Sequence, residues 1–151
     1  PVVSRFRSQT DTWAKLKKYC KPIRLTVFVT EQGVPSAIEL DTLDEHSHHV
    51  VVFNDRQNPV ATARLIASGK FGRMAVLKNY RRQGIGNELL RLINQQARHL
   101  KLEQLTCHAQ LSAEGFYIKN GFIRLGEPMD EAGIAHIKMI KTLNAAEDTL
   151  Q

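Results

Sequence analysis

The chain has 151 residues and a net charge of +6, from 21 lysines and arginines against 15 acidic residues. This length suits one domain over residues 1–151 that buries about two-thirds of its unfolded surface, and the 42% apolar fraction argues against disorder. No apolar run approaches the roughly 20 residues of a membrane helix, and no signal peptide opens the chain. We therefore expect a cytoplasmic protein that has no membrane partner.

The excess of basic residues favours an anionic partner, either nucleic acid or a phosphorylated small molecule. The basic residues are dispersed and no nucleic-acid-binding signature is visible, so the small molecule is the preferred interpretation. The two cysteines, Cys20 and Cys107, lack the spacing of a metal site. Cys107 is expected to pack inside a strand rather than to act as a nucleophile.

The first predicted elements are a strand over residues 2–7 and a helix over residues 11–20, with Thr10 as its N-cap. Pro22 is expected to kink or end this helix, or to open a new helical segment at its first turn. Residues 23–29 carry apolar positions that are consistent with more helix.

Gly33 and Pro35 end the helical region. The connector that follows, residues 36–48, is acidic and rich in histidine. Two short hydrophobic runs come next, residues 49–53 and 60–66, and the segment between them is dense in turn-forming residues. This pattern predicts a β-hairpin.

A third antiparallel strand is predicted over residues 71–77. The apolar positions of residues 87–101 lie on one face of a helix, and residues 104–109 read as a strand. A strand, a helix and a second strand in this order predict a right-handed crossover that ends in a parallel pair of strands.

The C-terminal part is predicted to contain a short helix over residues 112–120 with Ser112 as its N-cap, then strands over residues 122–125 and 134–143. The polar tail, residues 144–151, is expected to be frayed. Together these elements predict an α+β fold with a single mixed, mostly antiparallel sheet of six to seven strands flanked by helices.

The most informative segment is the turn at residues 81–86, before the long helix. Its two glycines let the backbone approach a ligand closely, and the first turn of a helix offers unpaired N–H groups and a positive dipole end. With basic side chains on the approach, this turn is predicted to bind a pyrophosphate. A Walker loop is excluded because no lysine and hydroxyl follow Gly86, and the dinucleotide fingerprint fails because Leu89 replaces its third glycine.

The order of several motifs extends this interpretation to nearly the whole chain. They are Arg73-Met74-Ala75-Val76, Tyr80-Arg81-Arg82-Gln83-Gly84-Ile85-Gly86, Ala109-Gln110 and Phe116-Tyr117-Ile118-Lys119-Asn120-Gly121-Phe122. In this order they resemble the GNAT superfamily of acyl-CoA-dependent N-acetyltransferases. Residues 27–35 and 130–136 are similar to its small, single-domain bacterial members.

The resemblance implies acetyl-CoA as cosubstrate, no metal, and a gap between splayed central parallel strands that admits the pantetheine arm. Backbone N–H groups of the turn would hold the CoA pyrophosphate, and an amide near Val76 would stabilise the oxyanion. The cofactor-binding residues implied in this way are Met74, Ala75, Val76, Arg81, Arg82, Gln83, Gly84, Ile85, Gly86 and Asn87.

The resemblance also implies that Tyr117 is the general acid that protonates the departing CoA thiolate. A phenol with a pKa near 10 is protonated at pH 7 and can serve this purpose. The alternative role of Tyr117 is that of a buried aromatic residue packed beside Phe116.

The amine must attack as the free base, and a lysine-like amine at pH 7 pays roughly 4 to 5 kcal/mol for losing its proton. A general base is therefore expected. The candidates are Glu31, Glu39, Asp41, Asp44, His48, His49 and His136. Our hypothesis places Glu39, Asp41 or His136 in the substrate pocket. The alternative for each candidate is a solvated surface charge or a capping residue. The clustered histidines at 46–49 lack the ligand spacing of a known metal site.

The expected function is N-acetyl transfer from acetyl-CoA to a primary amine, small molecule or peptide, by direct attack in a ternary complex. The alternative is a non-catalytic module that binds acyl-CoA. A nucleic-acid-binding protein is a third interpretation, which rests on charge alone. The resemblance leaves room for a homodimer.

Overall fold

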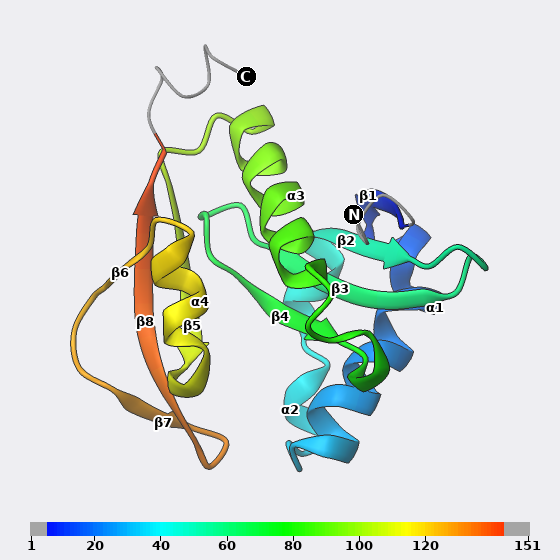
Figure 1. The fold of residues 1–151 in the computed structure, drawn as a ribbon, viewed down its shortest axis with the longest axis horizontal. Coiled ribbons are helices and arrows are strands. Elements are labelled where there is room, and N and C mark those ends of the chain that lie inside the picture. Colours follow the sequence, from blue (N-terminus) through cyan, green and yellow to red (C-terminus); the bar gives the residue numbers. More distant parts are fainter. Residues whose placement is uncertain (1–5, 144–151) are drawn as a thin grey trace.

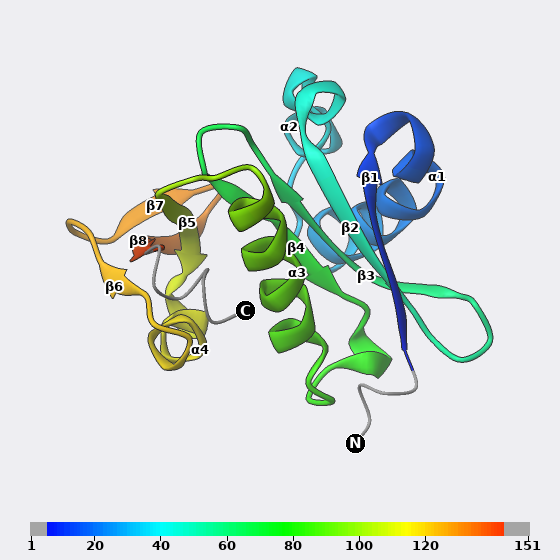
Figure 2. The ribbon, with the colours of Figure 1, turned by 90° about the horizontal axis from the view of Figure 1, so that it is seen from above.

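The computed structural model describes residues 6–143, and Figures 1 and 2 show their arrangement. The strands are β1 (Arg7–Thr12), β2 (His48–Phe53), β3 (Pro59–Leu65), β4 (Phe71–Val76), β5 (Gln104–Gln110), β6 (Ile123–Arg124), β7 (Met129–Glu131) and β8 (Ile134–Thr142). The α-helices are α1 (Trp13–Arg24), α2 (Ser36–Glu39), α3 (Ile85–His99) and α4 (Glu114–Lys119). None of the helices within this part of the chain combines the length and apolar character needed to cross a membrane.

The first four strands form an antiparallel sheet in the order β1-β2-β3-β4. The predicted hairpin and third strand are thereby confirmed. The strand predicted over residues 2–7 lies mostly outside the described residues, and the observed strand begins only at Arg7. The prediction missed β1 because this edge strand is polar and half-exposed, so it lacks apolar alternation.

Helices cover both faces of this sheet. Val50 and Val52 of β2 face the main core with α3, whereas Val51 and Phe53, which alternate with them, face α1. Figure 2 shows α1 and α3 on opposite sides of the strands. Because both faces are covered, β2 is apolar on both sides.

Helix α1 begins at Trp13, later than predicted, and its N-cap is Thr12 rather than Thr10. Pro22 does not end the helix, which continues to Arg24 and then into a π-helix over Leu25–Glu31. The predicted second helical stretch is therefore confirmed, and Gly33, with φ of 74°, follows its end.

The second sheet has the order β5-β8-β6, and β7 also pairs with β8. Ser112 is not the N-cap predicted for the short helix; a 3₁₀ turn over Leu111–Ala113 precedes α4, and Ala113 stands at the cap. The prediction missed β7, which is only three residues long.

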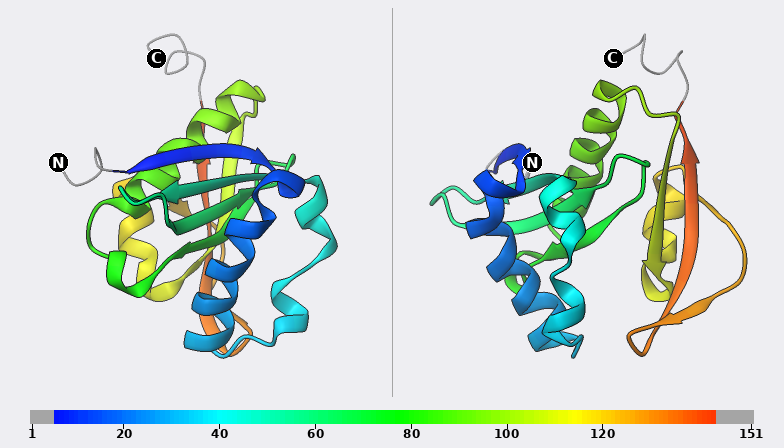
Figure 3. Two further views of the ribbon diagram at one scale, coloured as in Figure 1. Left: turned by 90° about the vertical axis from the view of Figure 1, so that its right-hand side faces the viewer. Right: turned by 180° about the vertical axis from the view of Figure 1, so that it is seen from behind.

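The two sheets meet at one parallel bridge, Lys70 with Thr106, where the N–H of Thr106 donates to the carbonyl of Gly69 (3.0 Å). Beyond this point β4 and β5 diverge, as Figures 1 and 3 show. The α+β class and the splayed parallel pair are confirmed; in detail, the eight strands of residues 6–143 are divided between two sheets rather than lying in one. This divergence leaves one edge of β4 unpaired.

Candidate functional site

A cavity of about 280 Å³ lies where β4 passes into α3. Its lining residues are Val76, Tyr80, Arg81, Arg82, Gly84, Ile85, Gly86, Asn87 and Phe116. Most of the turn predicted to bind a pyrophosphate therefore surrounds one cavity. Gln83 is not in the lining; its side-chain amide donates to the carbonyl of Asn79 (3.2 Å).

The backbone of this turn leaves the first N–H groups of α3 without a side-chain cap. Gly84 is the N-cap in the left-handed region, with φ of 83°, and glycine has no side chain to accept their hydrogen bonds. Arg82 also has a positive φ, 62°, which is uncommon for a residue that carries a Cβ. The first-turn N–H groups lack partners within the helix and stand at the positive end of its dipole. This is the electrostatic environment that a phosphate group requires.

Gly86 lies in the first turn of α3 beside the ring of Phe116. A Cβ placed on Gly86 would lie 3.4 Å from Cε1 and Cζ of that ring. Glycine at this position therefore keeps space open between the turn and the ring. The fit of the cavity to a diphosphate rests on the uncapped N–H groups.

The hydrogen bonding of β4 to β3 determines which backbone groups of β4 point to its other, free edge. The N–H of Leu77 donates to the carbonyl of Val60 on β3 (2.9 Å). Because successive residues of a strand direct their backbone groups to opposite edges, those of Val76 and Met74 point away from β3. The predicted pantetheine strand thus presents its backbone to the gap that β5 leaves.

Arg81 lies at this same edge. Its Nε–H donates to the carbonyl of Val76 (2.8 Å), and its guanidinium pairs with Glu31 (2.9 Å) at the end of the π-helix. One charge of the turn is therefore balanced by Glu31, which is occupied as an ion-pair partner. The two remaining residues of the predicted set lie on β4, where Met74 is half-buried and Ala75 is buried.

Tyr117 on α4 points back to β4. Its hydroxyl lies 3.6 Å from Sδ of Met74, and its ring packs among Phe71, Phe116 and Phe122. Burial raises the pKa of the Tyr117 phenol well above its ordinary value, and the neighbouring Cys107 adds to this effect. The hydroxyl is therefore protonated at neutral pH, beside the strand where a thioester would lie.

The interpretation of Cys107 as a packing residue agrees with its surroundings. The thiol is buried in the main core, and burial raises its pKa to about 12. Such a thiol is uncharged at neutral pH and is a poor nucleophile.

Two acids of the connector are not the solvated charges that the sequence suggested, although most of the connector is exposed. Glu39 and Asp44 are each 2% exposed and both bind Arg24, whose guanidinium lies 2.6 Å from Glu39 Oε1 and 2.7 Å from Asp44 Oδ1. Asp41 pairs with Arg64 (2.7 Å) and with Arg73 (3.1 Å). Three carboxylates thus face three guanidinium groups, and the cluster attracts no cation by net charge.

This buried cluster also holds the connector against β4. Arg73 has a left-handed backbone, with φ of 47°, next to the register shift between β3 and β4. Its side chain donates to the carbonyls of Glu39 (3.2 Å) and Ile38 (3.3 Å). Glu39 and Asp41 therefore act as structural partners in this arrangement, and their oxygens are engaged by arginines.

The candidate histidines lie in three different environments. His49 is buried against Trp13, with Nε2 2.9 Å from the carbonyl of Asp44, and His48 lies 3.2 Å from the amide of Gln96. His136, on β8, lies near the ion pair of His108 and Glu131. Its Nε2 is 3.9 Å from the Glu131 carboxylate, which also binds His108. Neither His108 nor Glu131 was singled out from the sequence.

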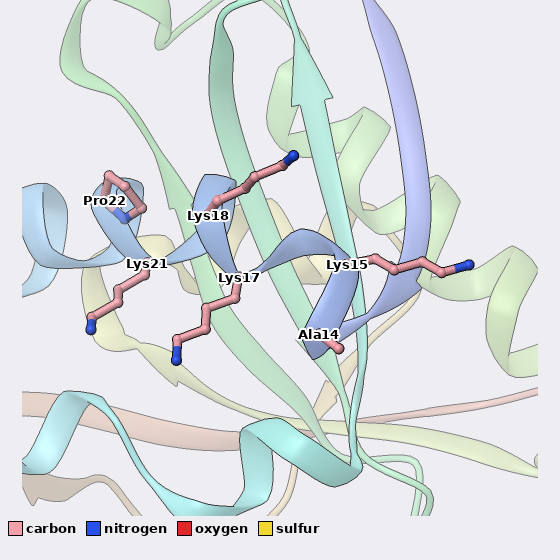
Figure 4. A pocket seen from close by; sticks show the side chains of 6 residues that line it. All are labelled: Ala14, Lys15, Lys17, Lys18, Lys21 and Pro22. Atoms are coloured by element: carbon pink, nitrogen blue, oxygen red, sulfur yellow. The ribbon is translucent and has the colours of Figure 1, made fainter.

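A larger hollow of about 580 Å³ lies over the outer face of α1, away from these groups. Its lining residues are Ala14, Lys15, Lys17, Lys18, Lys21 and Pro22. Figure 4 shows Lys17 and Lys21 directed to one side and Lys15 and Lys18 to the other, so the four ammonium groups do not converge. Lysines arranged in this way are typical of a solvated helix face, so we place the candidate site at the start of α3.

The chain belongs to the GNAT acetyltransferase family, because residues 16–143 match the family model described as an acetyltransferase (GNAT) domain. It is 36% identical over 123 residues to the uncharacterized N-acetyltransferase YjcF of Bacillus subtilis, an alignment that covers 79% of this chain and 87% of that protein. The family predicted from the motifs is thereby confirmed, and the family supports an acyltransferase activity.

Solved structures agree with this assignment. An acyl-CoA N-acyltransferase from Pseudomonas aeruginosa has a TM-score of 0.82 and 28% identity, over 90% of this chain and 99% of that one. A GNAT family acetyltransferase from Elizabethkingia anophelis, solved with acetyl-CoA bound, shares the fold with a TM-score of 0.67 and 18% identity, over 92% and 99% of the two chains.

Proposed function

We propose that this protein transfers the acetyl group of acetyl-CoA to a primary amine by direct attack in a ternary complex. The observation that carries the proposal is the cavity at the start of α3, where a left-handed Gly84 leaves the helix N–H groups uncapped. The Elizabethkingia relative of the same fold, with acetyl-CoA bound, supports acetyl-CoA as the ligand here.

Each protein group has a separate task in this proposal. The first-turn N–H groups of α3 bind the diphosphate, and the backbone groups of Met74 with the N–H of Val76 bind the pantetheine arm as an added strand would. The N–H of Val76 donates to the carbonyl oxygen of the thioester and stabilises the charge that develops there. Tyr117 donates its proton to the departing thiolate. The gain in rate comes chiefly from holding amine and thioester together.

The proposed activity is tested by thiol release from acetyl-CoA in the presence of spermidine, kanamycin, glucosamine or a lysine-containing peptide. Amine-dependent release, with an acetylated amine of the expected mass, supports the enzyme. Acetyl-CoA binding without turnover would support the alternative, a non-catalytic acyl-CoA-binding module. Absence of both binding and turnover would overturn the proposal.

We expect Tyr117→Phe to lower kcat on the order of 100-fold, because a general acid contributes at least this much. Since burial raises the pKa of Tyr117, its phenol stays protonated across the assay range. The loss should therefore be the same factor at pH 7 and at pH 9, with an unchanged Kd for acetyl-CoA. Stopped-time thiol assays and isothermal calorimetry measure these quantities.

Tyr19→Phe is the matched control, because Tyr19 packs against Phe53 on the far side of the first sheet. It should leave kcat unchanged. A Tyr117→Phe enzyme with wild-type kcat at both pH values would show that Tyr117 is only a core residue.

A further inference from the structure

Strand β5 divides its side chains between two faces. Cys107 and Ala109 belong to the main core, which also contains Tyr117. His108 and Gln110 alternate with them and so lie on the opposite face. On the neighbouring β8, Gln110 stands opposite His136 in the register. One face of the β5–β8 pair thus packs against the candidate general acid on α4, and the other face carries His108 on β5 and His136 on β8.

Glu131 of β7 joins these two histidines. One of its carboxylate oxygens accepts a hydrogen bond from Nδ1 of His108, and the other is 3.9 Å from Nε2 of His136. Because Nδ1 of His108 faces a carboxylate, this nitrogen carries the proton in the neutral ring, and Nε2 keeps its lone pair. The arrangement of carboxylate and imidazole is one that produces a general base with a defined tautomer.

The face of β5 that carries His108 is linked across the gap to the π-helix through Gln110. Gln110 donates its side-chain amide to Gln32 (2.9 Å), the residue after the π-helix. The adjacent Glu31 binds Arg81, which binds the carbonyl of Val76. Gln110, which lies on the same face of β5 as His108, is therefore held beside the end of the π-helix, next to the edge of β4.

We propose that His108, oriented by Glu131, accepts the proton of the acceptor amine; this inference rests on the proposed acetyl transfer. The ammonium form of the amine gives one proton to Nε2 of His108, and the freed electron pair of its nitrogen forms the C–N bond to the thioester carbonyl carbon; the nitrogen gives up a second proton to solvent as the neutral amide forms. The C–S bond then breaks, and the thiolate takes the proton of Tyr117 from the other face. The charged His108 returns its proton to solvent, and solvent reprotonates Tyr117.

The ionisable groups around His108 in the second sheet come from β7 and β8, and an ion pair lies across the gap. Glu131 lies on β7, whereas His136 and Lys138 lie on β8, with Lys138 opposite His108 in the register. Across the gap, Glu31 is paired with Arg81. The acid that contacts His108 is thus Glu131, and its negative charge stabilises the imidazolium that forms when the proton arrives.

The first test compares the steady-state kinetics of His108→Asn and Glu131→Gln with those of the wild type. The acceptor is whichever of spermidine, kanamycin, glucosamine and a lysine-containing peptide the wild type acetylates fastest. We expect His108→Asn to lower kcat at pH 7 about 100-fold, while the Kd for acetyl-CoA is unchanged. Its kcat should rise about tenfold per pH unit below the pKa of the amine, because only the free base then reacts. Wild-type kcat should show a shallower rise. His99→Asn, on the exposed end of α3, is the matched control.

The second test needs no acceptor. Long-range proton–nitrogen NMR should show neutral His108 protonated at Nδ1, and Glu131→Gln should abolish that preference and lower kcat less than His108→Asn does. A His108→Asn enzyme with wild-type kcat and pH profile would overturn the role, as would a His108 ring protonated at Nε2. If the wild type acetylates none of the four amines, the proposed function falls and this inference falls with it, whatever the tautomer.

Discussion

Gly86→Glu is expected to weaken acetyl-CoA binding by at least about 100-fold, or roughly 3 kcal/mol. The new Cβ would lie 3.4 Å from the ring of Phe116 and would fill the space beside the turn. The carboxylate would then place a negative charge at the end of the helix that is proposed to bind the diphosphate. Isothermal calorimetry with acetyl-CoA measures the Kd.

Gly86→Ala is the control that separates charge from bulk. A contact of 3.4 Å is close to ordinary van der Waals distance, so alanine should be accommodated by a small movement of Phe116. It should retain most of the affinity. Circular dichroism establishes that both variants fold. A folded Gly86→Glu protein that binds acetyl-CoA like the wild type would refute the placement of the diphosphate at this turn.

Arg24→Met is expected to destabilise the protein by about 3–5 kcal/mol, which is the usual loss when one partner of a buried ion pair is removed. Glu39 and Asp44 would stay buried without the guanidinium that makes their shortest contacts, and would keep only Arg73 (3.3 Å) and Arg64 (3.0 Å) as charged partners. For a chain of this size the thermal midpoint should fall on the order of 10 °C. Urea unfolding and calorimetry measure both quantities.

Arg91→Met is the matched control. Arg91 pairs with Glu88 three residues earlier on α3, and its side chain is 58% exposed. An exposed pair of this kind contributes less than about 1 kcal/mol. Equal small losses in the two variants would show that the buried cluster is not a stabilising connection between α1 and the connector.

The buried cluster also has a functional consequence. It ties the connector to β4 through Arg73, so a weakened cluster should disturb the strand that is proposed to bind pantetheine. This effect differs from that of Gly86→Glu, because it acts through the position of β4 and not through the phosphate site.

The turn at the start of α3 was predictable because its properties are local. Gly84 supplies a left-handed backbone, and helix periodicity after it identifies α3 with its uncapped first turn. The hairpin of β2 and β3 was predictable for the same reason, since turn residues and apolar runs are neighbours in the sequence. Helix ends were predicted less well: Thr10 and Ser112 were wrong as N-caps.

Partners of charged side chains could not be predicted in this way. Arg24 binds carboxylates 15 and 20 residues away, and His108 binds one 23 residues away. Nothing in the connector distinguishes Glu39 from a solvated acid. The alternation of apolar and polar residues in β5 could have predicted that His108 lies on the face opposite the core, because it stands between two buried positions. No comparable sequence pattern identified Glu131.

The amino-acid sequence by itself determined the family, the α+β class and the turn that is proposed to hold a diphosphate, because motif order and local backbone preferences are properties of short segments. The tertiary structure alone decided which carboxylates are engaged by arginines and which histidine is paired with a glutamate. The physical reason is that charges interact through distances in space, and folding brings together residues that the chain keeps far apart.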